Sequence, residues 1–177
     1  MLDIMLDLET LGVDPGCAIM SIGAIAFDLD EGALGEKFYV EIKPRTCEDM
    51  GLTINNDTLQ WWTHQSPEFI DRCLNTGKPV MNALCAFSNF IYAVSHNHDK
   101  VRIWGNGADF DNVILTAAYK ASGLVLPWNF RNNRCYRTAK AILPEFTVMR
   151  VGEHHNALDD AVTQALHLIK IVSSTRL

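Results

Sequence analysis

Three strand-like segments lie within the first 42 residues of this chain of 177 residues, with only short turn-forming stretches between them. An apolar run that carries acids covers residues 2–9, AIMSIGAIAF covers 18–27, and KFYVEI covers 37–42. The linking stretches contain DPG at 14–16 and DLDEGALGE at 28–36, which are typical of turns. Consecutive strands joined by short links favour an antiparallel meander.

Segments with helical character dominate the remainder of the chain. The sequence predicts helical pieces over 57–74, broken at a proline, and a clearer helix over 79–94. VRIWGNG at 101–107 predicts a further strand with a glycine-rich end, followed by helices over about 111–121 and 156–173. Helices that alternate with strands after a meander predict an α/β fold with a mixed sheet and helices on both of its faces.

The composition agrees with one globular domain over residues 1–177, because 48% hydrophobic and 20% charged residues are ordinary values and no repeat or linker is visible. The five cysteines are scattered without a CxxC pair, which predicts free thiols and a cytoplasmic location. No segment reaches about 18 apolar residues, so we expect no membrane association. The net charge of -6 argues against a broad basic surface, but it allows an acidic site that binds phosphate through cations.

Two acids interrupt the first apolar segment. Asp7 and Glu9 are two residues apart, so on a strand both side chains project from the same face. Burial of two carboxylates is costly unless a cation compensates their charge. The pair therefore indicates ligands for an ion, and the alternative is a solvated face at a sheet edge.

Two further acids stand where the strand near residue 105 leads into a helix. Asp109 and Asp111 lie in WGNGADFDNVIL, at the entrance of the helix predicted over 111–121. A carboxylate at this position can cap free backbone N–H groups and complement the helix dipole. We assign metal binding to Asp111, and capping or support of the site to Asp109.

The segment HNALDDA places a histidine and an acid at the start of the last predicted helix. His155 precedes Asp160 by five residues, so the imidazole can lie over the same site from the preceding loop. Most histidines beside an acid are surface residues or partners of that acid. The neighbouring His154 and Asp159 are interpreted as solvent-facing or supporting residues.

Taken together, the acids indicate a site for divalent metal ions. Carboxylates from separate elements make an all-oxygen site that suits Mg²⁺ or Mn²⁺ better than zinc. Two such ions, roughly 3.5 to 4 Å apart, can clamp the attacking and leaving oxygens of a phosphoryl displacement. A neutral histidine nearby is suited to act as general base for the attacking water.

The ordered segments DLET, NGADFD and HNALDD resemble the three exonuclease motifs of the DEDD superfamily, and the H-x4-D form of the last motif is that of its histidine subtype. This resemblance implies a ribonuclease H-like fold with His155 as general base. It also implies that two divalent ions are held by Asp7, Glu9, Asp111 and Asp160. TLQWWTHQS and WGNGADFDNVIL further resemble a branch with phage-type exonucleases and a bacterial exoribonuclease group.

The activity implied by the resemblance is 3′-5′ exonuclease hydrolysis of single-stranded DNA or RNA, with release of 5′-mononucleotides. The alternative is a catalytically silent nucleic-acid-binding or assembly module with the same fold. A further alternative keeps the hydrolysis but acts on very short oligonucleotides or on a non-nucleic phosphodiester. The sequence leaves the choice between DNA and RNA open.

Residues after the first two acids are implied to pack against the 3′-terminal nucleotide, although they could also be turn material. Adjacent tryptophans on a helix face different ways, so either Trp61 or Trp62 is predicted to lie in the core, and the other can stack on a base. The residues predicted to contact the substrate are Thr10, Leu11, Gly12, Trp61 and Asn106.

The most basic run of the chain, NFRNNRCYRTAK, is a candidate phosphate-tracking edge, although a solvated face is the commoner explanation. Its cationic residues are Arg131, Arg134, Arg137 and Lys140. Because the surface offers few other basic groups, a second copy in a homodimer is a further way to extend the substrate path.

Neutralisation of Arg134 and Arg137 together is expected to weaken nucleic-acid binding and to flatten its salt dependence. The reason is that binding releases fewer counterions when fewer phosphates are contacted. Fluorescence anisotropy with a labelled single strand at several salt concentrations measures both quantities. An unchanged affinity and salt slope would remove this edge from the substrate path.

Overall fold

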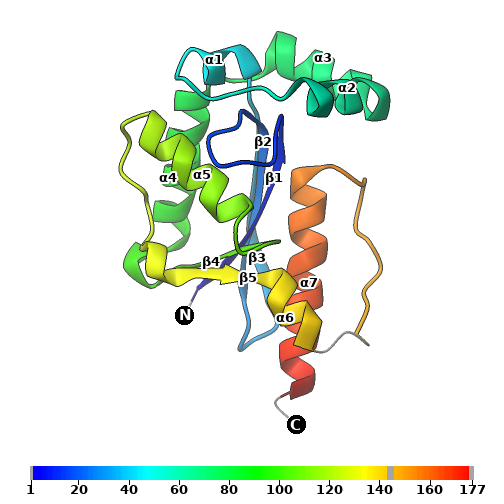
Figure 1. Ribbon diagram of the computed structural model, residues 1–177. Helices are drawn as coiled ribbons and strands as arrows, with labels where there is room; N and C mark the ends of the chain where they lie inside the picture. The colour runs from blue at the N-terminus through cyan, green and yellow to red at the C-terminus, as the bar shows by residue number, and fades with distance from the viewer. Residues whose placement is uncertain (1, 143–145, 176–177) are drawn as a thin grey trace.

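The computed structural model describes residues 2–142 and 146–175. Its centre is a five-stranded sheet in the order β3-β2-β1-β4-β5 (Figure 1). The first three strands pair antiparallel, whereas β4 runs parallel to β1 and β5 parallel to β4. The predicted meander and mixed sheet are therefore confirmed. The strands are β1 Asp3–Thr10, β2 Ile19–Asp28, β3 Ala33–Glu41, β4 Arg102–Gly105 and β5 Asn133–Cys135.

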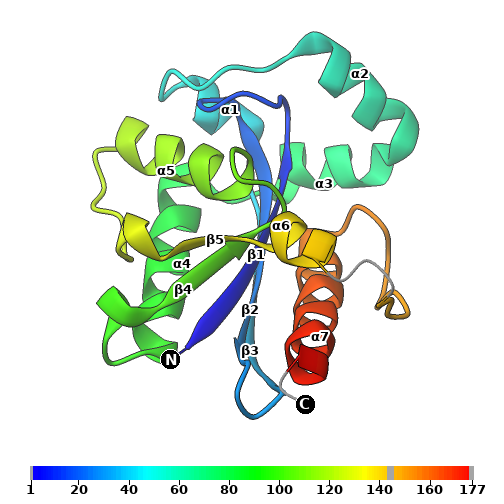
Figure 2. The same cartoon turned by 60° about the horizontal axis from the view of Figure 1, so that its bottom comes forward.

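Helices cover both faces of the sheet, as predicted: α4 and α5 lie on one side, and α7 with α6 on the other (Figures 1 and 2). The predicted break at Pro67 separates α2 from α3. No helix in the described ranges has the length and apolar character needed to span a membrane. The helices are α1 Pro44–Glu48, α2 Asn56–Gln65, α3 Pro67–Thr76, α4 Val80–Val94, α5 Asp111–Ala121, α6 Tyr136–Ile142 and α7 Ala157–Thr175, with single 3-10 turns at His98–Lys100 and Phe130–Asn132.

Strand β1 divides the core into two layers, because successive side chains of a strand point to opposite faces. Ile4, Leu6 and Leu8 belong to the large apolar cluster on the side of α4 and α5. Met5 belongs to the cluster that contains the buried residues of α7. Since Asp7 shares the parity of Met5, the acids of β1 face α7.

Two stretches differ from the expectation. Strand β3 begins at Ala33, within the stretch 28–36 that was expected to be a turn. The side chain of Asp28 closes a shorter turn by accepting hydrogen bonds from the backbone N–H groups of Asp30 (2.7 Å) and Glu31 (3.0 Å), and pairing with β2 then extends the strand. Pairing energy outweighs the weak strand propensity of this stretch.

The basic run near residue 134 contains β5 and α6, which the sequence pattern did not predict. Strand β5 pairs with β4 through only three residue pairs, and Tyr136 gives α6 a buried anchor. Such short elements depend on tertiary contacts, since their polar sequence has neither strand alternation nor an apolar helical face.

A close approach of α7 to β2 depends on Gly23, which pairs with Asp7 across the sheet. A Cβ atom at position 23 would lie 2.1 Å from the carbonyl carbon of Ala157 and 2.2 Å from the backbone nitrogen of Leu158. The first turn of α7 therefore rests directly on the backbone of β2. This contact places the beginning of α7 beside the acids of β1.

The substitution Gly23→Ala is expected to lower the free energy of unfolding by about 1 to 3 kcal/mol, because the added methyl group overlaps the backbone of α7. Gly35→Ala in β3 is the matched control, since its Cβ would meet its nearest neighbour only at 3.3 Å. Urea unfolding followed by circular dichroism measures both losses. Equal losses in the two variants would contradict the close approach.

Candidate active site

Two acids of β1 and one acid of α7 lie close together in the fold. Carboxylate oxygens of Asp7 and Glu9 on β1 and of Asp160 on α7 all lie within 4.8 Å of one another. Gln164, one helical turn after Asp160, donates from Nε2 to Oδ1 of Asp7 at 2.7 Å and so ties α7 to β1. The structure thus brings together these three predicted site residues.

Asp111, the first residue of α5, is buried beside this cluster. Its Oδ1 accepts from the backbone N–H of Leu8 at 3.1 Å, and its Oδ2 accepts from that of Asn106 at 2.6 Å. Because Leu8 stands between Asp7 and Glu9, these bonds fix the carboxylate next to the acid pair. A carboxylate can accept further contacts on the remaining lone pairs of both oxygens.

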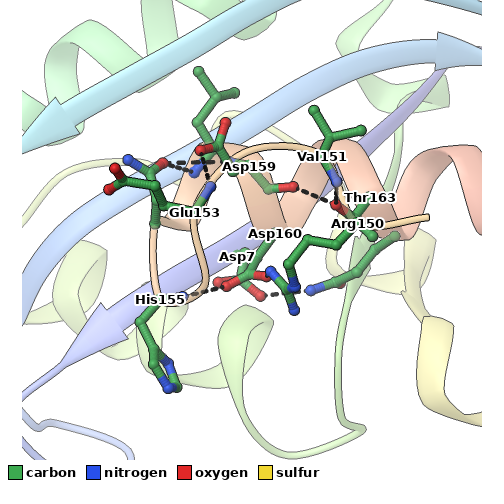
Figure 3. Close-up of polar contacts among 11 residues, drawn as sticks. Asp7, Arg150, Val151, Glu153, His155, Asp159, Asp160 and Thr163 are labelled. Carbon is green, nitrogen blue, oxygen red and sulfur yellow. Dashed lines mark hydrogen bonds and ion pairs between the residues drawn. The ribbon is translucent and has the colours of Figure 1, made fainter. Parts of the chain in front are cut away.

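The segment before α7 contacts both oxygens of Asp160 (Figure 3). The guanidinium of Arg150 forms an ion pair with Oδ1, and the backbone N–H of His155 donates to Oδ2 at 3.1 Å. His155 has a φ of 62°, a left-handed conformation that is uncommon outside glycine. Its ring packs edge-on against Trp61 and Trp62, at centroid distances of 5.1 and 5.8 Å.

A cavity of about 460 Å³ opens over the acids. Of the residues predicted for the site, those that line it are Asp7, Glu9, Asn106, His155 and Asp160. Arg150 and Lys140 also face this space. The cavity is therefore polar and carries both negative and positive groups.

Mutual proximity changes the electrostatics of the acids. Burial, followed by the charges of Asp160 and Asp111, raises the pKa of Glu9 to about 8. The pKa of Asp7 is raised well above its ordinary value, by burial and then by the charges of Asp111 and Glu9. Burial raises the pKa of Asp111 to about 6, against the opposing effect of the backbone N–H groups that it accepts from. Ionisation of Asp7, Glu9 and Asp111 together thus requires a positive partner.

One carboxylate oxygen of the cluster also lacks a positive or hydrogen-bonding partner. Oε1 of Glu9 is buried and has no hydrogen-bond partner within the described part of the chain. A buried acceptor without a partner is destabilising, and a bound cation would satisfy it. The donor set, carboxylate oxygens from β1, α5 and α7, is the kind that hard divalent cations prefer.

The residues predicted to contact the substrate at the end of β1, Thr10 to Gly12, are buried. Leu11 is 1% exposed and its side chain belongs to the core, so it can offer a nucleotide only its main chain. Oγ1 of Thr10 donates to the carbonyl of Gly12 at 2.6 Å. Trp62 is 2% exposed and donates from Nε1 to the carbonyl of Thr10 at 3.0 Å, whereas Trp61 is 45% exposed. The prediction that one of the two tryptophans lies in the core is confirmed.

The capping role predicted for Asp109 is not found. Helix α5 begins at Asp111, the residue before it is Phe110, and no side chain makes the cap hydrogen bond. Asp109 is exposed one residue further from the helix. The carboxylate of Asp111 instead turns back to the backbone of β1, which explains why this acid and not Asp109 is buried.

Two residues of the site were not predicted from the sequence. Gln164 follows Asp160 by four residues, so helical spacing already places both on one face and could have revealed it. Arg150 lies in a stretch without periodicity, where the sequence carries no signal. In the basic run, Lys140 faces the cavity, but the guanidinium of Arg134 donates to the backbone carbonyls of Arg131 and Asn133.

A family model described as the 3′-5′ exoribonuclease Rv2179c-like domain matches residues 2–172 of the chain. The chain belongs to this exoribonuclease domain family. The predicted relation to 3′-5′ exonucleases is thereby confirmed. A curated relative of this exoribonuclease-family chain is the exodeoxyribonuclease of Enterobacteria phage T4, which is 27% identical over 128 residues, 65% of this chain and 54% of the phage protein. The chain thus spans about half the length of that relative.

Solved structures similar to the exoribonuclease-family chain confirm the ribonuclease H-like fold. Cell-death related nuclease 4 (CRN-4) aligns with a TM-score of 0.71 at 17% identity, over 98% of this chain and 64% of that one. The nuclease domain of 3′hExo, a DEDDh family member bound to rAMP, aligns with a TM-score of 0.66 at 12% identity, over 98% and 92%. Product-bound exonuclease I aligns with a TM-score of 0.67 at 15% identity, over 98% and 43%.

The raised pKa values predict that the protein, when stripped of divalent cations, becomes less stable as the pH rises. The pKa of Glu9 is about 8 in the folded protein against an ordinary 4.5, so between these values the folded protein holds a proton that the unfolded chain releases. In a chelator, the free energy of unfolding should fall on the order of 3 kcal/mol between about pH 5 and pH 8. Urea unfolding at both pH values should show that the free energy of unfolding of Glu9→Gln falls less than that of the wild type. Equal falls in the two proteins would contradict the buried, acidic surroundings assigned to Glu9.

Proposed function

We propose that this member of the exoribonuclease family is a divalent-metal-dependent 3′-5′ exonuclease that removes 5′-mononucleotides from single-stranded nucleic acid. The observation that carries the proposal is the convergence of Asp7, Glu9 and Asp160, whose oxygens lie within 4.8 Å of one another at the floor of a polar cavity. Like charges at this distance in a buried setting need cations to be stable as carboxylates.

The proposed ligands are Asp7, Glu9, Asp111 and Asp160, and the proposed cofactor is a pair of Mg²⁺ or Mn²⁺ ions. The residues fit such ions because Oε1 of Glu9 is a buried acceptor without a partner, and because Asp111 is held in place by two backbone N–H groups. When bound, the ions would polarise the scissile phosphate and stabilise the charge on its attacking and leaving oxygens.

His155 is the proposed general base. Its pKa is lowered, first by burial and then by the charge of His154, so the imidazole is neutral near pH 7 and able to accept a proton. A ring nitrogen of His155 takes the proton of the attacking water as the new oxygen–phosphorus bond forms. The bond from phosphorus to the 3′ oxygen breaks, and that oxygen takes up a proton from solvent.

RNA is the proposed substrate class, because the matching family is described as exoribonuclease and its model covers residues 2–172, whereas the phage deoxyribonuclease aligns with only 65% of the chain. Trp61, exposed beside His155, is the proposed stacking surface for a base, and Asn106 a contact at the cavity wall. We also propose that residues 1–177 form a single exonuclease domain. The homodimer and the cytoplasmic location stay predictions.

The proposal is tested by incubation of 5′-labelled single-stranded RNA, matched DNA, and duplexes with 3′ overhangs, each with Mg²⁺, Mn²⁺ or a chelator. Stepwise shortening of RNA with release of 5′-mononucleotides is expected, and its loss in the chelator and in Asp7→Ala. Faster loss of DNA would reverse the substrate choice. Absence of shortening with every ion would favour a non-catalytic binding module.

His155→Ala is expected to fold as the wild type does and to lose about 10²- to 10⁴-fold in turnover, because a general base is removed without a core side chain. His64→Ala is the matched control, since His64 is exposed on α2 and does not line the cavity. Single-turnover rates and thermal unfolding measure the two effects. Full activity of His155→Ala would refute the assignment of the base.

A further inference from the structure

Arg150 pairs directly with one of the proposed metal ligands. Its guanidinium contacts Oδ1 of Asp160, with Arg150 39% exposed and Asp160 14% exposed (Figure 3). The other oxygen of Asp160 accepts the backbone N–H of His155. Both oxygens are thus engaged by the segment that precedes α7, and the positive charge stands within the acidic cavity.

The guanidinium and a divalent cation would compete for the same oxygen. An arginine binds a carboxylate through strong, charge-assisted hydrogen bonds and cannot lose its charge by deprotonation. A cation at Oδ1 of Asp160 would repel the guanidinium beside it, and this repulsion between two positive charges favours release of Arg150.

We propose that Arg150 is a displaceable counter-ion: it holds Asp160 until a divalent cation takes that oxygen, and its guanidinium then contacts a phosphate of the bound strand. This inference rests on the proposed function of the site. It assigns two successive anionic partners to Arg150, first a carboxylate and then a phosphate.

The surrounding segment allows such a movement of the side chain alone. The backbone N–H of Val151 donates to Oγ1 of Thr163 at 3.0 Å, and that of Glu153 donates to Oδ2 of Asp159 at 2.8 Å. These bonds hold the chain on both sides of Gly152 to α7. The guanidinium can therefore exchange partners while the backbone beside His155 keeps its place.

The first test is the affinity for Mn²⁺, measured by titration calorimetry on protein freed of metal and without nucleic acid. Arg150→Gln is expected to bind Mn²⁺ about threefold to tenfold more tightly, because no ion pair has to be broken. Arg137→Gln is the matched control: it removes an equal charge that acts on Asp111 but is not paired with Asp160. An affinity of Arg150→Gln that equals the wild type, or a gain no larger than that of the control, would overturn the counter-ion role.

The second test is thermal unfolding. In a chelator, Arg150→Gln should unfold at a lower temperature than the wild type, and saturating Mn²⁺ should remove the difference, since the cation replaces the lost charge. Arg72→Gln breaks a comparable ion pair with Glu41 outside the site and should be shifted equally under both conditions. A shift of Arg150→Gln that is the same with and without Mn²⁺ would also overturn the role.

The phosphate contact is tested by steady-state kinetics on single-stranded RNA at saturating Mn²⁺. Arg150→Gln is expected to raise KM about tenfold with a smaller change in kcat, and Arg150→Lys to recover part of it. An unchanged KM would overturn the phosphate contact. If the wild type binds no divalent cation, the proposed function fails; if it binds Mn²⁺ and degrades RNA while Arg150→Gln keeps wild-type affinity and KM, only the present inference fails.

Discussion

Repulsion between closely spaced carboxylates is the constraint on which the rest of the structure depends. Asp7, Glu9 and Asp160 are held together although burial and neighbouring charges raise the pKa values of Asp7 and Glu9 and so oppose the ionisation of these two. The opposing force comes from packing and polar contacts: α7 rests on the backbone of β2 at Gly23, Gln164 ties it to β1, and Arg150 pairs with Asp160. The fold thus holds the acids close together against a charge repulsion that a bound cation would relieve.

Much of this arrangement can be predicted from the sequence, because its strongest patterns are local. Alternation of apolar residues and acids in β1 identified the face shared by Asp7 and Glu9, and the meander follows from short turns. The sequence favoured Asp111 over Asp109 as the site residue, but the reason for its burial needed tertiary structure, since its carboxylate accepts from the backbone N–H groups of Leu8 and Asn106. The sequence likewise could not predict strand β5, helix α6 or the ion pair of Arg150, because polar stretches take their conformation from distant contacts.

The net negative charge of the chain limits how the site can recognise nucleic acid. A net charge of -6 repels nucleic acid at long range, so recognition has to rest on local groups. The cavity offers these in Lys140 and Arg150, and in Trp61 beside its rim. The family is described as exoribonuclease, and in the proposed function the bound cations and these few local groups take the place of a broad basic surface.

The order of the acids along the chain has a consequence for synthesis. Strand β1 is synthesised some 150 residues before α7, which carries Asp160, although the two lie side by side in the fold (Figure 1). Until α7 is made, the sheet face that carries Met5 lacks the buried residues of that helix, and the chain lacks Asp160. Because domains fold as units during translation, assembly of the acidic cluster and completion of the core then arise in a single event.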